Sequence, residues 1–209
     1  MQFVAKLRVE AKEMTPLSLE EIPQVLDLAN GTEYYSIILT AIHTGMRRNE
    51  LLGLRWKDVN LDEAVIYLSR SIYRTKGGVT EYQTTKTKSG SRPIDLTPPS
   101  VIHLRTLWGK QKIDALLYGY EVTEDSPVFI RTKGEPLLPY AVTHGFKGIV
   151  KKLGLDDVRF HDLRHTHATV MLLQFYCNNL PTDILVGLHG DLDLTWIHLA
   201  CLVCTSSNP

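Results

Sequence analysis

The most informative stretch of the chain is Phe160-His161-Asp162-Leu163-Arg164-His165-Thr166-His167-Ala168-Thr169. No other ten residues hold so many groups that can carry a proton near a phosphate. His161 and Arg164 are three residues apart, so a helix running to about Gln174 would place them on one face. A proton carrier beside a guanidinium suits a phosphodiester better than a metal ion or an acyl group.

The whole chain has the size and composition of one soluble globular domain. Its 209 residues are 44% hydrophobic and 22% charged, which leaves room for a single core and a small appendage. The 23 basic residues balance the 23 acidic ones, so only local clusters of charge can indicate nucleic acid. One such cluster spans residues 70–92, with Glu81 as its single acid. Its cations, of which all but Lys86 are candidate DNA-binding residues, are Arg70, Arg74, Lys76, Lys86, Lys88 and Arg92.

The sequence predicts a cytoplasmic protein without a membrane partner. It contains no run of about 18 apolar residues, and its N-terminus lacks a charged segment followed by an apolar one. The three cysteines all fall within the last 33 residues, and an odd number so placed does not make a disulfide framework. A reducing compartment fits this usage.

Helical periodicity dominates the first quarter of the chain. Ser18 and Glu21 form a capping box, followed by apolar residues at helical spacing up to Asn30. Residues 33–44 are apolar on nearly every side and predict a buried helix that ends near Gly45. A further helix is expected over residues 47–56, with a core face made of Leu51, Leu52 and Leu54.

The middle of the chain changes to the period of β-strands. Apolar residues between Val65 and Leu96, interrupted by Gly77-Gly78 and Ser89-Gly90, predict a small antiparallel sheet of about three strands. Pro98-Pro99 should open a long helix to about Leu117. Its expected apolar positions are Ile102, Leu107 and Leu116. With an extended piece at 128–130 and a helix over 140–153, the predicted fold is mainly α with a small three-stranded antiparallel β-sheet.

Three segments resemble, in the right order, the boxes of tyrosine recombinases of the phage-integrase type. They are Thr44-Gly45-Met46-Arg47-Arg48-Asn49-Glu50-Leu51-Leu52-Gly53-Leu54-Arg55-Trp56, then Thr85-Lys86-Thr87-Lys88-Ser89-Gly90-Ser91-Arg92-Pro93-Ile94, then His161 to Thr169. The resemblance covers about Thr15 to Thr169. It implies the fold of the recombinase catalytic domain and DNA strand exchange through a covalent 3′-phosphotyrosine. It further implies double-stranded DNA and other recombinase subunits as partners, without a metal, a nucleotide cofactor or a small-molecule substrate.

The resemblance assigns a phosphate clamp to two arginines. Arg47 and Arg164 would hold the two non-bridging oxygens on which charge builds during in-line attack. Arg48 is the rival for the first position, but the family pattern places the clamp directly after Gly45-Met46, so we expect Arg48 at the surface. Glu50 matches the acidic partner that braces the catalytic cations.

Proton transfer is assigned to three further positions. Lys86 matches the family's lysine, which protonates the leaving 5′-oxygen, and Lys88 is its neighbouring alternative. His161 matches the residue that supports proton transfer at the nucleophile and contacts the phosphate. His189 lies roughly where the family has a histidine that hydrogen-bonds the phosphate. His165 and His167 are interpreted as packing or helix-surface groups.

The resemblance fails at the nucleophile. The tyrosine should follow His189 by nine or ten residues, where this chain has His198 and Leu199. Tyr176, directly after the predicted helix, is interpreted as an aromatic residue that closes it. We therefore expect a divergent tail over 176–209, a core over 15–175, and a linker or the stub of an N-terminal domain over 1–14. The expected chain binds DNA weakly, with a steep dependence on salt, and does not cleave it unless a partner supplies the tyrosine in trans.

Two other interpretations fit parts of the sequence. One is a DNA-binding module derived from an integrase that performs no chemistry. The other is a zinc site, for which the candidate ligands are His161, His165, His167, Cys201 and Cys204. A zinc site would leave Arg47, Arg164 and Lys86 without a purpose.

Overall fold

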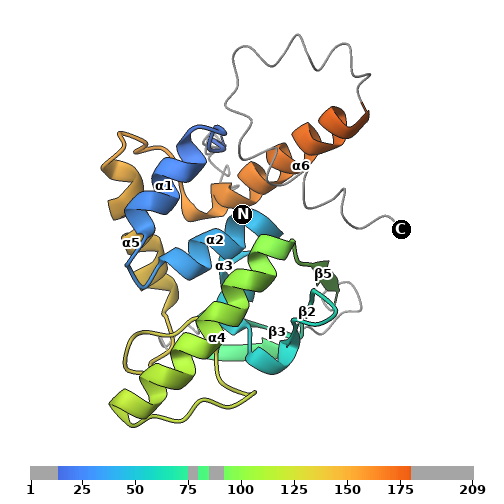
Figure 1. Ribbon diagram of the computed structural model, residues 1–209. Helices are drawn as coiled ribbons and strands as arrows, with labels where there is room; N and C mark the ends of the chain where they lie inside the picture. The colour runs from blue at the N-terminus through green and yellow to red at the C-terminus, as the bar shows by residue number, and fades with distance from the viewer. Residues whose placement is uncertain (1–13, 75–79, 85–91, 180–209) are drawn as a thin grey trace, which may run out of the picture.

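The computed structural model describes residues 14–74, 80–84 and 92–179 (Figure 1). A central helix organises these residues, as the sequence predicts: α2 (Tyr35–Thr44) contacts α1 (Glu21–Ala29), α3 (Arg48–Gly53), α4 (Pro98–Tyr118) and α6 (Leu163–Asn179). Because neighbours surround α2, its residues are buried on nearly every side. The remaining α-helix, α5 (Pro139–Lys151), packs against α1 and α3.

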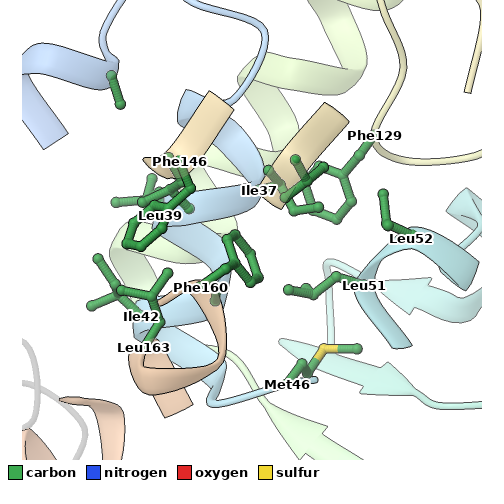
Figure 2. Close-up of a cluster of buried hydrophobic side chains, with 14 of the residues drawn as sticks. Ile37, Leu39, Ile42, Met46, Leu51, Leu52, Phe129, Phe146, Phe160 and Leu163 are labelled. Atoms are coloured by element: carbon green, nitrogen blue, oxygen red, sulfur yellow. The ribbon is translucent and has the colours of Figure 1, made fainter. Parts of the chain in front are cut away.

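Figure 2 shows the core where these helices meet. Ile37, Leu39 and Ile42 of α2 lie with Phe146 of α5 and the side chains that open α6. The rings of Phe146 and Phe160 meet edge to face, with centroids 5.5 Å apart. This geometry is favourable for aromatic pairs and fixes the start of α6 against α5.

The expected boundaries hold at several helices. The capping box is present, since the Ser18 backbone N–H donates to Glu21 Oε2 (2.8 Å) and the Glu21 N–H donates to Ser18 Oγ (3.3 Å). The α5 helix buries Phe146, Ile149 and Val150, as predicted. The predicted helix over 47–56 is instead split into α3 and the 3₁₀ turn η1 (Trp56–Asp58). The residues Leu51, Leu52 and Leu54 are nevertheless buried, as expected.

The small antiparallel sheet is confirmed, and it has three strands in the order β1 (Val59–Asn60), β2 (Val65–Tyr67), β5 (Pro93–Asp95). In its register Ile66 faces Val59 on one side and Ile94 on the other. Two further strands, β3 (Arg70–Arg74) and β4 (Thr80–Thr84), form a separate ribbon. This ribbon lies against α3, where a Cβ atom on Gly53 would come within 2.9 Å of the backbone of Arg70 and Ser71. A glycine at this position therefore lets β3 pack closely against α3.

The apolar face predicted for α4 is wrong in two of its three residues. Ile102 is 67% exposed and Leu116 is 87% exposed, whereas Leu104 and Gln111 are buried. Gln111 is tolerated inside because its amide is satisfied twice: it accepts from Trp56 Nε1 (2.8 Å) and donates to the Val128 carbonyl (2.7 Å). Leu107 packs against the core, as predicted.

The helix α6 differs from its prediction at both ends. The 3₁₀ turn η2 (Phe160–Asp162) precedes it, and it continues past Gln174 to Asn179. The backbone of Tyr176 thus lies inside the helix rather than after it. Within the described residues, no helix is long and apolar enough to span a membrane.

Candidate functional site

The corner between α2 and α3 is the centre of the candidate site. Gly45 ends α2 in the left-handed conformation, with φ of +60° and its N–H bonded to the Ala41 carbonyl at 2.9 Å. This ending is usual for a helix followed by glycine, because glycine carries no Cβ to clash there. Two residues later Arg47 has extended backbone angles and starts α3. The corner therefore fixes where the Arg47 side chain leaves the backbone.

Glu50 holds Arg47 through two contacts. Its Oε2 accepts the Arg47 backbone N–H (2.8 Å), and its Oε1 accepts from Arg47 Nη1 (2.9 Å). Arg92 Nη2 lies 3.6 Å from the same Oε2, so one carboxylate serves two guanidinium groups. The side chain of Glu50 is 10% exposed and that of Arg47 is 54% exposed. A buried anion that orients an accessible cation is the arrangement that a bracing role requires.

Arg164 reaches the same corner from a distant part of the chain. It lies in the first turn of α6, and its Nη1 donates to the Gly45 carbonyl at 2.6 Å across 119 residues of sequence. A guanidinium carries five N–H donors, so this bond can coexist with a bidentate contact to a phosphate. The structure thus brings Arg164 to the same short turn from which Arg47 leaves the backbone.

A buried aspartate sets the turn in front of Arg164. Asp162 Oδ2 accepts from the backbone N–H and the Nε of Arg159 (2.8 and 3.0 Å), and its Oδ1 accepts from Nη2 (3.0 Å). Arg55 and Asp58 make the same set of contacts around η1. We did not predict these braces from the sequence. Their signal is the repeated spacing Arg-x-x-Asp with an aromatic residue after the arginine.

The geometry of η2 and α6 leaves His161 accessible. His161 is exposed and Arg164 is half-buried, whereas Asp162, Leu163 and Thr166 face the core. The ring of His161 meets that of His165 edge to face, with centroids 6.0 Å apart. His161 thus lies in the turn η2 and Arg164 in the first turn of α6, so the two residues do not share one helix as the sequence analysis expected.

Two half-buried histidines, His43 and His167, lie near the corner. His43 of α2 is bonded to Thr97 Oγ1 (3.0 Å), and the His167 ring of α6 has Nδ1 2.9 Å from the Ile42 carbonyl. Burial lowers the pKa of His43 to about 4, with help from the charges of His167 and His103. Burial also lowers the pKa of His167, and Arg164 acts in the same direction. Burial thus favours the neutral form of both imidazoles near the corner.

Arg48 differs from its expected place at the surface. It is half-buried, its Nη1 donates to Thr143 Oγ1 of α5, and its Nε donates to Asn49 Oδ1 (3.2 Å). Burial lowers the pKa of its guanidinium. Arg48 therefore joins α3 to α5, and Arg47 is the arginine of this pair that the corner presents to solvent.

The basic cluster over residues 70–92 is described in part. Arg70 Nε donates to the Gly53 carbonyl (2.6 Å), and its guanidinium lies 4.1 Å from the centre of the Tyr82 ring. Burial and the nearby Arg55 lower its pKa. Arg70 is thus engaged in holding β3 and β4 on α3, and we leave it out of the proposed DNA contacts.

Other candidate positions lie outside the described residues. Only the backbone of Arg74 is described, at the end of β3 opposite Thr80. The following positions lie outside the described residues: Lys76, Lys86, Lys88, His189, His198, Leu199, Cys201 and Cys204.

The zinc interpretation finds no support in the part of the chain that the structure describes. There, no three His, Cys, Asp or Glu side chains are grouped so that they could hold a metal ion. His161 and His165 contact each other, whereas His167 is bonded to Ile42 on α2. The three histidines therefore do not converge on one point.

Curated relatives are transposases and recombinases. The chain is 28% identical over 203 residues to Transposase A from transposon Tn554 of Staphylococcus aureus (strain Mu50), a match that covers 94% of this chain and 52% of that protein. It is 27% identical over 168 residues to a tyrosine recombinase XerC-like protein of Caldanaerobacter subterraneus subsp. tengcongensis, covering 75% and 43%. The chain therefore spans about half the length of these relatives. Because the match to Transposase A leaves out only about a dozen residues of this chain, the similarity to that protein extends well past Gln174.

Solved structures share the fold. The integrase of the Tn1549 transposon, in complex with transposon right end DNA, matches with a TM-score of 0.65 and 22% identity, over 86% of this chain and 58% of that chain. The XerA recombinase matches with a TM-score of 0.55 and 22% identity, over 80% and 53%.

The sequence pattern of the phage integrase family matches residues 12–175, which is most of the chain. This range contains the corner at Gly45, its brace Glu50 and the arginine that α6 contributes from the far end of the domain. By this match over most of its length, the chain belongs to the phage integrase family.

Proposed function

We propose that this chain forms the catalytic-domain part of a site-specific DNA recombinase, in which Arg47 and Arg164 bind one phosphate of double-stranded DNA. The bond from Arg164 Nη1 to the Gly45 carbonyl carries the proposal, because it joins two arginines from separate boxes at one turn. The transposase and recombinase relatives support it, as does the fold shared with an integrase solved in complex with transposon DNA.

The chemistry of the proposed site follows from its charges. Attack on a phosphodiester builds negative charge on two non-bridging oxygens, and a pair of guanidinium groups stabilises that charge best when both are oriented beforehand. Here the buried Glu50 orients Arg47, and the Gly45 carbonyl orients Arg164. His161, accessible beside Arg164, would contact the phosphate or the nucleophile. The resemblance supplies Lys86 as general acid and His189 as a further phosphate contact.

The phosphate clamp predicts a specific loss of DNA affinity. Replacing Arg47 or Arg164 by alanine should weaken binding to a fluorescein-labelled duplex by about tenfold or more, since hydrogen bonds to charged groups contribute about 1.5–3 kcal/mol. The slope of log K against log salt should fall by about one, because one phosphate contact is lost. Fluorescence anisotropy across a salt series measures both quantities.

A matched control distinguishes the loss of the phosphate contact from the loss of one positive charge elsewhere on the surface. Arg105 on α4 is 54% exposed and pairs with Asp62, so Arg105→Ala removes one exposed cation away from the corner and should leave affinity nearly unchanged. Arg164→Lys keeps the charge without the fork of donors, and we expect only partial recovery. Equal losses in the Arg105 and Arg47 variants would refute the clamp. Circular dichroism melting curves confirm that each variant is folded.

A binding module without cleavage is the second candidate, and the residues after His189 favour it. His198 and Leu199 stand where the family resemblance places the tyrosine. We therefore expect a nicked suicide duplex to be bound but not to form a covalent protein adduct. An adduct on denaturing gels would contradict this expectation. Since the Tyr176 backbone lies within α6, Tyr176→Phe should have no effect, and loss of an adduct in that variant would identify Tyr176 as the nucleophile.

A further inference from the structure

We propose that His167 is a positioning residue, which holds the end of α2 so that Arg47 and Arg164 share one phosphate. The part of this proposal that concerns DNA binding rests on the function proposed above. His167 lies one turn after Arg164 on α6, so both side chains leave the same face of that helix. Both reach α2: Arg164 contacts the Gly45 carbonyl and His167 contacts the Ile42 carbonyl.

The contact with Ile42 completes the end of a helix. The last four carbonyls of an α-helix lack partners within the helix, and a side chain from elsewhere can satisfy them. In α2 the Ala41 carbonyl is taken by the Gly45 N–H at 2.9 Å. His167 Nδ1 lies 2.9 Å from the next carbonyl, that of Ile42. Because a carbonyl only accepts, Nδ1 must carry the proton, and His167 acts as a C-terminal cap supplied by α6.

The ring of His167 also determines the shape of the corner. A Cβ atom built on Gly45 would lie 2.5 Å from Cδ2 and 3.0 Å from Cγ of His167, so the ring occupies the space beside the glycine. The ring can therefore pack beside the corner only because residue 45 is a glycine. Arg47 begins two residues later, and its direction depends on this turn. His167 thus acts on the phosphate through the backbone and not by contact.

Two substitutions of His167 separate the effect of the lost hydrogen bond from the effect of a changed side-chain volume. In His167→Asn the amide Nδ2 can take the place of Nδ1 and keep the bond to Ile42, whereas His167→Leu keeps an apolar side chain and loses the donor. We expect His167→Leu to weaken binding of the labelled duplex by about three- to tenfold, the factor that corresponds to one lost buried hydrogen bond. His167→Asn should restore most of the affinity.

A double-mutant cycle tests whether the effect passes through Arg47. If His167 acts by orienting Arg47, the loss caused by His167→Leu should largely disappear in the Arg47→Ala background. Affinity is measured well below the melting temperature of every variant. A His167→Leu protein that melts earlier but binds DNA as tightly as the wild type overturns the proposal.

A second readout needs no DNA. The Nε–Hε signals of Arg47 and Arg164 in a ¹H–¹⁵N NMR spectrum, assigned by their loss in the alanine variants, should shift in His167→Leu. The signal of Arg105 should stay in place. Unshifted arginine signals overturn the positioning role. A wild-type protein that does not bind DNA, combined with shifted signals, overturns the proposed function and supports the positioning role.

Discussion

Replacing Gly45 by alanine is expected to lower the free energy of unfolding by about 2–5 kcal/mol. Part of the loss is backbone strain, because φ is +60° at this residue and a side chain there costs about 1–2 kcal/mol. The rest is a collision, since the new Cβ would lie 2.5 Å from the His167 ring, and overpacking of this kind costs about 1–3 kcal/mol. Urea denaturation followed by circular dichroism measures the change.

Gly119 provides a matched control for the cost of backbone strain. It ends α4 in the same left-handed conformation, with φ of +71°, and a Cβ added there would meet nothing within 4 Å. Gly119→Ala should therefore cost only the strain. In a His167→Ala background the extra cost of Gly45→Ala should vanish, because the colliding ring is gone. Equal costs at the two glycines in the wild-type background would show that the contact with His167 contributes nothing.

The local parts of the site could be predicted because short spacings determine them. Gly45 ends a helix, Arg47 begins the next one, and Glu50 lies three residues further on, where its carboxylate can reach back to the helix start. The bond from Arg164 to Gly45 spans 119 residues, and no periodicity in the sequence indicates it. Only the family resemblance placed these two arginines in one site.

The errors have a common physical origin in tertiary packing. Apolar spacing placed Ile102 and Leu116 inside, but α4 instead buries Gln111, a polar residue whose amide finds two buried partners. Such partners come from other elements, so hydrophobic periodicity within the helix cannot reveal them. Arg48 was likewise expected at the surface because its partner, Thr143, is 95 residues away.

Lowering the pH should destabilise this domain more than protonation of its carboxylates alone would. Burial, followed by the charges of His167 on α6 and His103 on α4, lowers the pKa of His43 from its usual 6.5 to about 4. Burial lowers the pKa values of His103 and His167 as well. The unfolded chain therefore binds protons that the folded chain excludes. Stability is complete above pH 6.5 and falls as the pH drops from 6.5 towards 4.

The expected loss from His43 alone is about 3 kcal/mol at pH 4, since each unit of pKa difference corresponds to 1.36 kcal/mol. Urea denaturation at a series of pH values should show His43 lowering the free energy of unfolding by about 1.4 kcal/mol per pH unit below pH 6, with the other two histidines adding to this slope. His43→Asn removes the titrating ring and leaves a side chain that can still bond to Thr97. The slope of its unfolding free energy against pH should therefore be smaller by about 1.4 kcal/mol per pH unit, the contribution of one proton. An unchanged slope in that variant would assign the acid sensitivity to other groups, because a residue that cannot titrate cannot contribute to the linkage.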